Sequence, residues 1–196
     1  MSKIILIAGY PAAGKSTFAR KLSEHLKIPY LAKDNIREIM ADAFGAKNRE
    51  LLNRNKNGSR AAFALMLHMA ERLLQVGSPC ILESNFQVLH PHPTPEIEQI
   101  KYLLAKHNCE CLTFTFKGDL DIISKRYFDR DANRHWVHEK AENPQSIKEY
   151  CTTTRLDEFA IGKTITIDTT TFSSIDHENL YALARNFLTA TATCSL

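Results

Sequence analysis

The chain has 196 residues, a formal net charge of +3 and a hydrophobic fraction of 44%. That length suits one α/β domain with its own core, so we expect residues 1–196 to form a single domain. The composition excludes disordered, collagen-like and linker proteins, and no apolar run approaches the roughly 20 residues of a membrane span. The mild positive charge suits anionic ligands but is too weak to indicate nucleic acid by itself.

The cysteines and the first residues indicate a reducing compartment. Five cysteines occur, and no two of them form a C-x-x-C pair, which argues against a disulfide framework or a zinc site. A strand-like run begins at Lys3, with no charged and apolar leader before it. We therefore expect a cytoplasmic protein with free thiols and no membrane contact.

Short apolar runs alternate with helical periodicities along the chain. Strands are expected at residues 3–8, 28–32, 80–83, 109–116 and 164–168. Helices are expected at residues 15–26, 36–44, 63–74, 94–107, 119–134, 144–159 and 176–188. The basic stretch over residues 47–60 is expected to be a solvated loop. Strands that alternate with helices in this way predict a parallel sheet covered on both faces.

Residues 9–17 match the phosphate-loop pattern G-x-x-x-x-G-K-[ST] in full, between an apolar strand and a helix. Such a loop turns its backbone N–H groups toward phosphates, and the helix N-terminus adds positive potential. We predict that Lys15 contacts the β and γ oxygens of ATP and that the Ser16 hydroxyl ligates Mg²⁺. The predicted nucleotide-binding residues are Gly9, Tyr10, Pro11, Ala12, Ala13, Gly14, Lys15, Ser16 and Thr17.

A second metal ligand is predicted where the third strand ends. Glu83 leaves this buried strand, and Ser84 and Asn85 follow it. A carboxylate at this place holds the water shell of Mg²⁺ in phosphate-loop folds. The longer Glu side chain favours contact through water over direct coordination. A carboxylate that only caps a turn is the alternative interpretation.

Asp34 and Arg37 follow the second strand and enter the next helix. This places them at the carboxyl edge of the sheet, where ligands bind in open α/β folds. In the functional interpretation, Asp34 accepts the proton of an attacking hydroxyl and Arg37 holds an anionic part of the acceptor. A helix cap at Asp34 and a solvated position for Arg37 are the alternatives.

Arg126, Arg130 and Arg134 recur at intervals of four residues, which places them on one face of a predicted helix. We interpret residues 119–140 as a lid that closes over the triphosphate, neutralises charge on the γ group and excludes water. Arg126 and Arg130 are its predicted catalytic cations. A salt-bridged, solvated helix face is the alternative.

Taken together, four segments resemble those of the small P-loop kinases, which include phage-type polynucleotide kinase, zeta toxin, chloramphenicol phosphotransferase and AAA-type predicted kinases. The matching segments are residues 9–17, 33–37, 81–85 and 126–135. The resemblance implies a three-layer α/β fold with a five-stranded parallel sheet in the order 2-3-1-4-5 and a helical arginine lid. It also implies ATP with Mg²⁺, a catalytic Asp34, and an acceptor site that includes Arg37 and Asn85. Glu83 stands where the family usually has Asp.

The predicted function is therefore an ATP-dependent kinase that phosphorylates a hydroxyl of a small-molecule acceptor. A nucleic-acid 5′-hydroxyl kinase and a nucleotide-dependent ATPase or binding module are the alternatives. Residues 55–58 lack the Asp of the N-K-x-D guanine signature, which disfavours a GTPase-like module. The sequence leaves the acceptor and the oligomeric state open.

Overall fold

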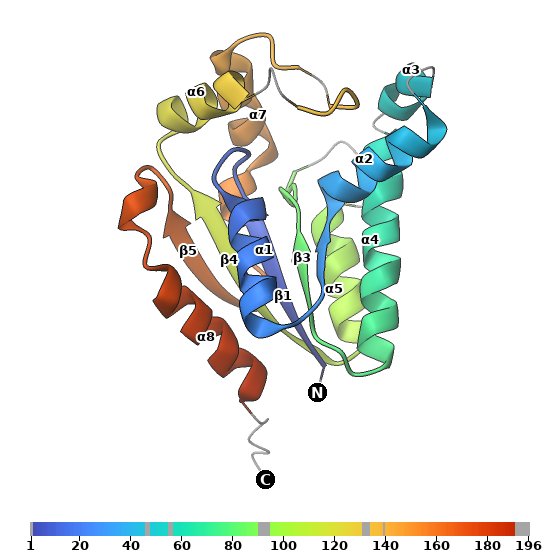
Figure 1. The fold of residues 1–196 in the computed structure, drawn as a ribbon, viewed down its shortest axis with the longest axis vertical. Coiled ribbons are helices and arrows are strands. Elements are labelled where there is room, and N and C mark those ends of the chain that lie inside the picture. The colour runs from blue at the N-terminus through green and yellow to red at the C-terminus, as the bar shows by residue number, and fades with distance from the viewer. Residues whose placement is uncertain are drawn as a thin grey trace.

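The computed structural model describes residues 2–45, 48–54, 57–89, 95–130, 134–138 and 140–190. Five parallel strands form one sheet in the order β2-β3-β1-β4-β5 (Figure 1). The strands are β1 (Ser2–Gly9), β2 (Tyr30–Ala32), β3 (Cys80–Glu83), β4 (Cys109–Lys117) and β5 (Lys163–Asp168). The predicted α/β fold and strand order are confirmed. Only β2 is markedly shorter than the sequence predicted.

Four helices cover the two faces of the sheet. They are α1 (Lys15–Leu26), α4 (Asn57–Gln75), α5 (Glu96–Lys106) and α8 (His177–Thr189). Side chains alternate along a strand, so Ile5 and Ile7 of β1 pack toward α1 and α8. Ile4 and Leu6 pack toward α4 and α5 on the opposite face. All four side chains are fully buried, which explains the continuous apolar run that opens the chain.

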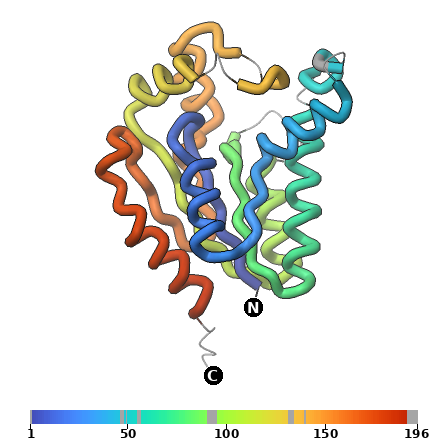
Figure 2. Tube along the Cα trace, viewed as in Figure 1, coloured from blue at the N-terminus to red at the C-terminus, as the bar shows by residue number. Residues whose placement is uncertain are grey.

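The remaining helices lie at the carboxyl edge of the strands, at the top of Figures 1 and 2. They are α2 (Lys33–Phe44), the short α3 (Arg49–Asn53), α6 (Leu120–Arg130) and α7 (Pro144–Thr154). Short 3₁₀ turns follow at Leu156–Glu158 and Phe172–Ser174. The sequence placed a loop where α3 and the start of α4 occur, and this prediction was wrong for the described residues.

Two predicted helix ends also differ from the structure. The helix expected over residues 119–134 is described from Leu120 to Arg130, and Arg134, the next described residue, is not helical. The shared helical face predicted for the three arginines is therefore wrong for Arg134. The helix expected to reach Phe159 ends at Thr154, because Arg155 adopts a left-handed conformation with φ 51°.

Two further findings concern the whole of the described chain. Cys80, Cys109, Cys111 and Cys151 are free thiols, whereas Cys194 lies outside the described residues. Among the described helices, none combines the length and the apolar character needed to cross a bilayer.

Gly9 allows β1 to approach β4 closely where the phosphate loop begins. Its φ is +110°, and a Cβ on it would lie 2.0 Å from the carbonyl oxygen of Phe116 in β4. The N–H of Tyr10 donates to this same oxygen at 2.8 Å. A side chain at position 9 would therefore force the two strands apart at the start of the loop.

Replacement of Gly9 by Ala should destabilise the protein far more than the same change at Gly77. Gly77 also has a positive φ, of +73°, but a Cβ there meets nothing within 4 Å. We expect Gly77→Ala to cost about 1–2 kcal/mol, the left-handed strain of an L-residue. Gly9→Ala should cost about 3 kcal/mol or more, because the clash adds to that strain. Urea unfolding measures both, and equal losses would contradict the close approach.

Candidate active site

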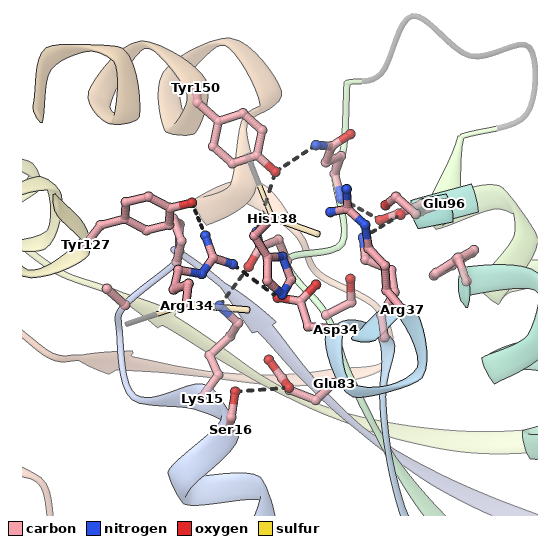
Figure 3. A pocket seen from close by; sticks show the side chains of 18 of the residues that line it. Lys15, Ser16, Asp34, Arg37, Glu83, Glu96, Tyr127, Arg134, His138 and Tyr150 are labelled. Atoms are coloured by element: carbon pink, nitrogen blue, oxygen red, sulfur yellow. Dashed lines mark hydrogen bonds and ion pairs between the residues drawn. The ribbon is translucent and has the colours of Figure 1, made fainter. Parts of the chain in front are cut away.

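A cavity of about 750 Å³ lies at the carboxyl edge of the sheet, within the volume range of small-molecule sites. Figure 3 shows side chains from distant parts of the chain that converge on it. The residues predicted for the site that line it are Pro11, Ala12, Gly14, Lys15, Ser16, Thr17, Asp34, Arg37, Glu83, Asn85 and Arg130. Tyr10 and Ala13, also predicted, are instead packed into the core beneath the loop.

Lys15 is buried at the floor of the cavity. Its Nζ donates to the carbonyl oxygen of Tyr10 at 2.6 Å and to Oδ1 of Asn85 at 2.8 Å. Burial lowers the pKa of Lys15 to about 8, although the Glu83 and Asp34 carboxylates act in the opposite direction. Two neutral oxygens thus hold a buried cation, and no carboxylate among the described residues forms an ion pair with it in direct contact. Phosphate oxygens would supply the negative charge that this ammonium requires.

Ser16 and Glu83 form an oxygen pair beside Lys15. The Ser16 hydroxyl donates to Oε2 of Glu83 at 3.2 Å, and the Tyr30 hydroxyl donates to the same oxygen at 3.1 Å. Burial raises the pKa of Glu83, an effect that the Lys15 ammonium partly offsets. Hydroxyl and carboxylate oxygens are the ligands that Mg²⁺ prefers, usually together with substrate phosphates. This donor set fits the magnesium ion that the sequence predicts.

Asp34 does not cap its helix. The N-cap of α2 is Ala32, and Asp34 occupies the second helical position. Its carboxylate is 53% exposed, and the Arg134 guanidinium lies 3.8 Å from it. Desolvation by the cavity walls alone would raise the pKa of Asp34, but nearby positive charge, chiefly that of Lys33, lowers it overall. Asp34 therefore presents an ionised carboxylate within the cavity at neutral pH.

Arg130 and Arg134 bring two positive charges to the cavity from the predicted lid region. Both line it, and their guanidinium groups lie over the ring of Tyr127, at 5.4 Å and 5.0 Å from its centroid. Arg134 also donates to the Tyr127 hydroxyl. Figure 3 shows the Arg134 guanidinium between Tyr127 and Asp34.

Arg126 is positioned differently from Arg130. Its guanidinium donates to the carbonyl oxygens of Thr169 and Thr170 at 2.5 Å and 2.7 Å and stacks on Phe172 at 4.1 Å. It does not belong to the described cavity lining. A direct contact between Arg126 and a transferred phosphoryl group would require these bonds to break. The catalytic role of Arg126 stays a prediction.

The segment 134–138, which we call the strap, lies within the predicted lid region and contacts α2. Nε2 of His135 lies 2.9 Å from Oδ1 of Asp42, and Nε2 of His138 lies 2.7 Å from Oε1 of Glu38. Because Glu38 and Asp42 are four residues apart, both carboxylates present one face of α2 to the strap. The two contacts hold the strap beside the cavity, which Arg134 and His138 help to line.

Arg37 of α2 adds a further hydrogen bond to the contact between α2 and the strap. It donates to the carbonyl oxygen of Val137 in the strap at 3.1 Å and to Oδ1 of Asn53 in α3 at 2.8 Å. Arg37 lines the cavity as predicted, but these bonds show that it also braces the strap. Its role as a ligand of the acceptor stays a prediction.

Sequence analysis did not predict one wall of the cavity. This wall, which we call the far wall, includes Lys33, Gln87, Glu96 and Tyr150. Nζ of Lys33 lies 3.0 Å from Oε1 of Glu96, the first residue of α5. Nε2 of Gln87 donates to the Tyr150 hydroxyl of α7 at 2.7 Å. The members of each pair are 63 residues apart, so no local pattern could reveal them. The neighbouring Pro95, which precedes a helix, was the sole local signal.

The pH dependence of stability should report on His138. Burial lowers its pKa, although Asp34 and Glu38 raise it. The folded state then binds fewer protons than the unfolded state below about pH 6.5, so stability is lost as the pH falls through that value. We expect the free energy of unfolding to decline from about pH 7 to pH 5, with a shallower slope in His138→Gln. His68→Gln, on the exposed face of α4, is the matched control; identical slopes in both variants would contradict the prediction.

Comparison with known proteins places this geometry in a family. The chain matches a family model described as an AAA domain over residues 4–146. A solved structure described as a "putative kinase", from Chloroflexus aurantiacus, shares 26% identity with a TM-score of 0.77 and covers 95% of this chain and 96% of its own. No curated protein matches the chain.

Two other solved structures share the fold at lower identity. The shikimate kinase of Acinetobacter baumannii, in complex with shikimate, is 19% identical with a TM-score of 0.60 and covers 96% of this chain and 93% of its own. A sugar kinase from a Janibacter species is 14% identical with a TM-score of 0.57 and covers 96% and 95%. Because the family match spans most of the sequence, the chain belongs to this AAA domain family of small P-loop kinases.

Proposed function

We propose that the protein is an ATP-dependent kinase that transfers the γ-phosphoryl group to a hydroxyl of a small-molecule acceptor. One observation carries the proposal: the buried Lys15 ammonium and the ionised Asp34 carboxylate share a single cavity. The first attracts polyphosphate, and the second attracts a hydroxyl proton. Phosphoryl transfer to an alcohol requires both groups within one site.

Different residues of this chain would perform different parts of such a transfer. Lys15 would exchange the oxygens of Tyr10 and Asn85 for those of the β and γ phosphates. Ser16 and Glu83 would hold Mg²⁺, which neutralises phosphate charge when it is bound. Arg130 would add positive charge beside the γ group from above the cavity.

Asp34 would orient the acceptor hydroxyl. A new bond forms between the hydroxyl oxygen and the γ phosphorus, the bond from that phosphorus to ADP breaks, and the hydroxyl proton passes to Asp34. In a loose transition state the hydroxyl loses its proton late, so alignment by the carboxylate matters more than its basicity. An ionised Asp34, held so by nearby cations, can perform both tasks.

The strap supports a water-excluding role for the lid region. Its contacts with Glu38 and Asp42 of α2 bring the region after α6 across the acceptor side of the cavity. A kinase must exclude water from the γ-phosphoryl group, because hydrolysis competes with transfer. The shared fold of a sugar kinase and a shikimate kinase supports a small molecule as the acceptor.

The direct test is an acceptor screen that measures ADP release above the rate without acceptor. Transfer to small alcohols supports the proposal. Label transfer from ATP to 5′-hydroxyl oligonucleotides alone would favour the nucleic-acid kinase instead. Tight ATP binding with no transfer to any acceptor would favour a binding module.

Replacement of Lys15 by Ala should lower the rate of transfer at least about a hundredfold, near 2.7 kcal/mol of barrier. The buried ammonium is the charge that contacts the γ phosphate in the proposed complex. Lys21→Ala provides the matched control, since Lys21 lies on the exposed face of the same helix. Normal transfer by Lys15→Ala would refute the assigned role.

Replacement of Asp34 by Asn should lower kcat about a hundredfold or more while ATP affinity stays within about threefold. The change removes the proton acceptor but keeps the size of the side chain and leaves the phosphate loop intact. Calorimetry of ATP binding and steady-state kinetics measure the two quantities. A variant with unchanged kcat would show that Asp34 takes no part in the transfer.

A further inference from the structure

The far wall of the cavity holds a nearly buried ion pair that phosphate binding does not use. Lys33 begins α2 and Glu96 begins α5, and their side chains are 11% and 15% exposed. Burial of two charges costs about as much as their attraction returns, and an apolar pair of similar size is often equally stable. The pair is therefore poorly explained by stability alone, and both residues line the cavity.

Both members of the pair keep hydrogen-bonding capacity toward the cavity. The Lys33 ammonium has about three donors. Among the described residues, the Glu96 carboxylate is the one side chain to which it donates a hydrogen bond, and it also lies 5.9 Å from the centroid of the Phe63 ring. Glu96 accepts from Lys33 and from the backbone N–H of Gln87, at 3.0 Å and 3.1 Å. A carboxylate has about four acceptor positions, so further positions remain for a ligand.

A second donor and acceptor set adjoins the ion pair. The Tyr150 hydroxyl accepts from Nε2 of Gln87 at 2.7 Å and from Nδ2 of Asn85 at 3.4 Å. These bonds use neither the hydroxyl proton of Tyr150 nor Oε1 of Gln87. Phe86, between the two amides, is fully buried with φ 49° and stacks on Phe159 at 4.9 Å. This anchor fixes the backbone that carries both amide side chains.

We infer that this wall binds the vicinal hydroxyls of an uncharged polyol, such as a sugar or a cyclitol. The inference rests on the proposed kinase function and names its acceptor class. A hydroxyl donates and accepts at once, so neighbouring hydroxyls can accept from Lys33 and donate to Glu96. A carboxylate or phosphate at this wall could contact Lys33 but would also lie against the Glu96 charge, whereas an apolar acceptor would leave both charges unsolvated.

The location of the wall suits a polyol that is phosphorylated at a different hydroxyl. In the view of Figure 3, Asp34 is drawn between Lys15 and Glu96. The hydroxyl nearest Asp34 would therefore be the one phosphorylated, while others on the same molecule contact the ion pair. Lys33 and Glu96 are assigned here as residues that determine specificity, and Asp34 keeps the chemical role.

Matched acceptors on the wild-type protein provide the first test. The probes are glycerol with glycerate, glucose with gluconate, and myo-inositol, each compared with a simple alcohol, 1-propanol. At least one uncharged polyol should raise ADP release about tenfold above both its carboxylate counterpart and the simple alcohol, a difference near 1.4 kcal/mol in barrier. The phosphorylated product is identified by mass spectrometry.

A double variant distinguishes a binding role from a structural one. Lys33→Met with Glu96→Met removes both charges together, so neither charge is left unpaired. The N–H of Gln87 loses one acceptor, a modest loss that the fold should survive. We expect KM for the polyol to rise about tenfold or more, with KM for ATP within about twofold. The control is the exposed pair Glu98 and Lys101, which are 2.8 Å apart on α5, the helix that also carries Glu96. Glu98→Gln with Lys101→Met should change neither the KM for the polyol nor the KM for ATP.

Each outcome decides the inference. Preferential transfer to carboxylate acceptors, to 1-propanol or to none of the probes overturns it, as does an unchanged polyol KM in the double variant. If the double variant fails to fold, deoxy analogues of the active polyol replace it on the wild-type protein, and equal turnover of these analogues overturns the inference. Lys15-dependent transfer to an acid overturns only the acceptor class, whereas absence of ATP binding overturns the kinase assignment itself.

Discussion

The burial of one ammonium group organises this structure. Lys15 is 5% exposed and is held by two neutral oxygens, and within the described part of the chain no carboxylate contacts its ammonium directly. The neighbouring elements hold Lys15 in this position. The fully buried β1 fixes the start of the loop, Gly9 brings β1 against β4, and α1 begins at the lysine itself. A polyphosphate is the ligand that best satisfies such a buried cation.

The cavity above Lys15 combines groups with separate tasks. In the proposed complex, Ser16 and Glu83 would hold the metal that accompanies the phosphates. Nearby positive charge keeps Asp34 ionised in the same cavity. The strap is held beside the cavity through contacts with two carboxylates of α2. Asn85 links the lysine of the phosphate loop to α7, because it accepts from Lys15 and donates to Tyr150. Movement of Lys15 toward phosphate would therefore release Asn85 and alter the acceptor wall.

The sequence predicted what depends on local patterns. The phosphate loop, the limits of α1 and the bounds of β3 follow from contiguous residues, and the strand order followed from the family resemblance. Features that depend on tertiary contacts were missed. Arg134 leaves the helix predicted for it, and the Lys33–Glu96 pair joins segments 63 residues apart. Hydrophobic periodicity carries no information on which polar side chains meet across a cavity.

The fate of the γ-phosphoryl group tests the central claim most directly. The reaction is run in ¹⁸O-labelled water with the most active acceptor, and ADP, phosphorylated acceptor and inorganic phosphate are measured together. The account predicts phosphorylated acceptor in amounts equal to ADP and without solvent oxygen in its phosphoryl group, because the alcohol oxygen attacks in a site closed to water. Inorganic phosphate that carries solvent oxygen and accounts for all the ADP would contradict it.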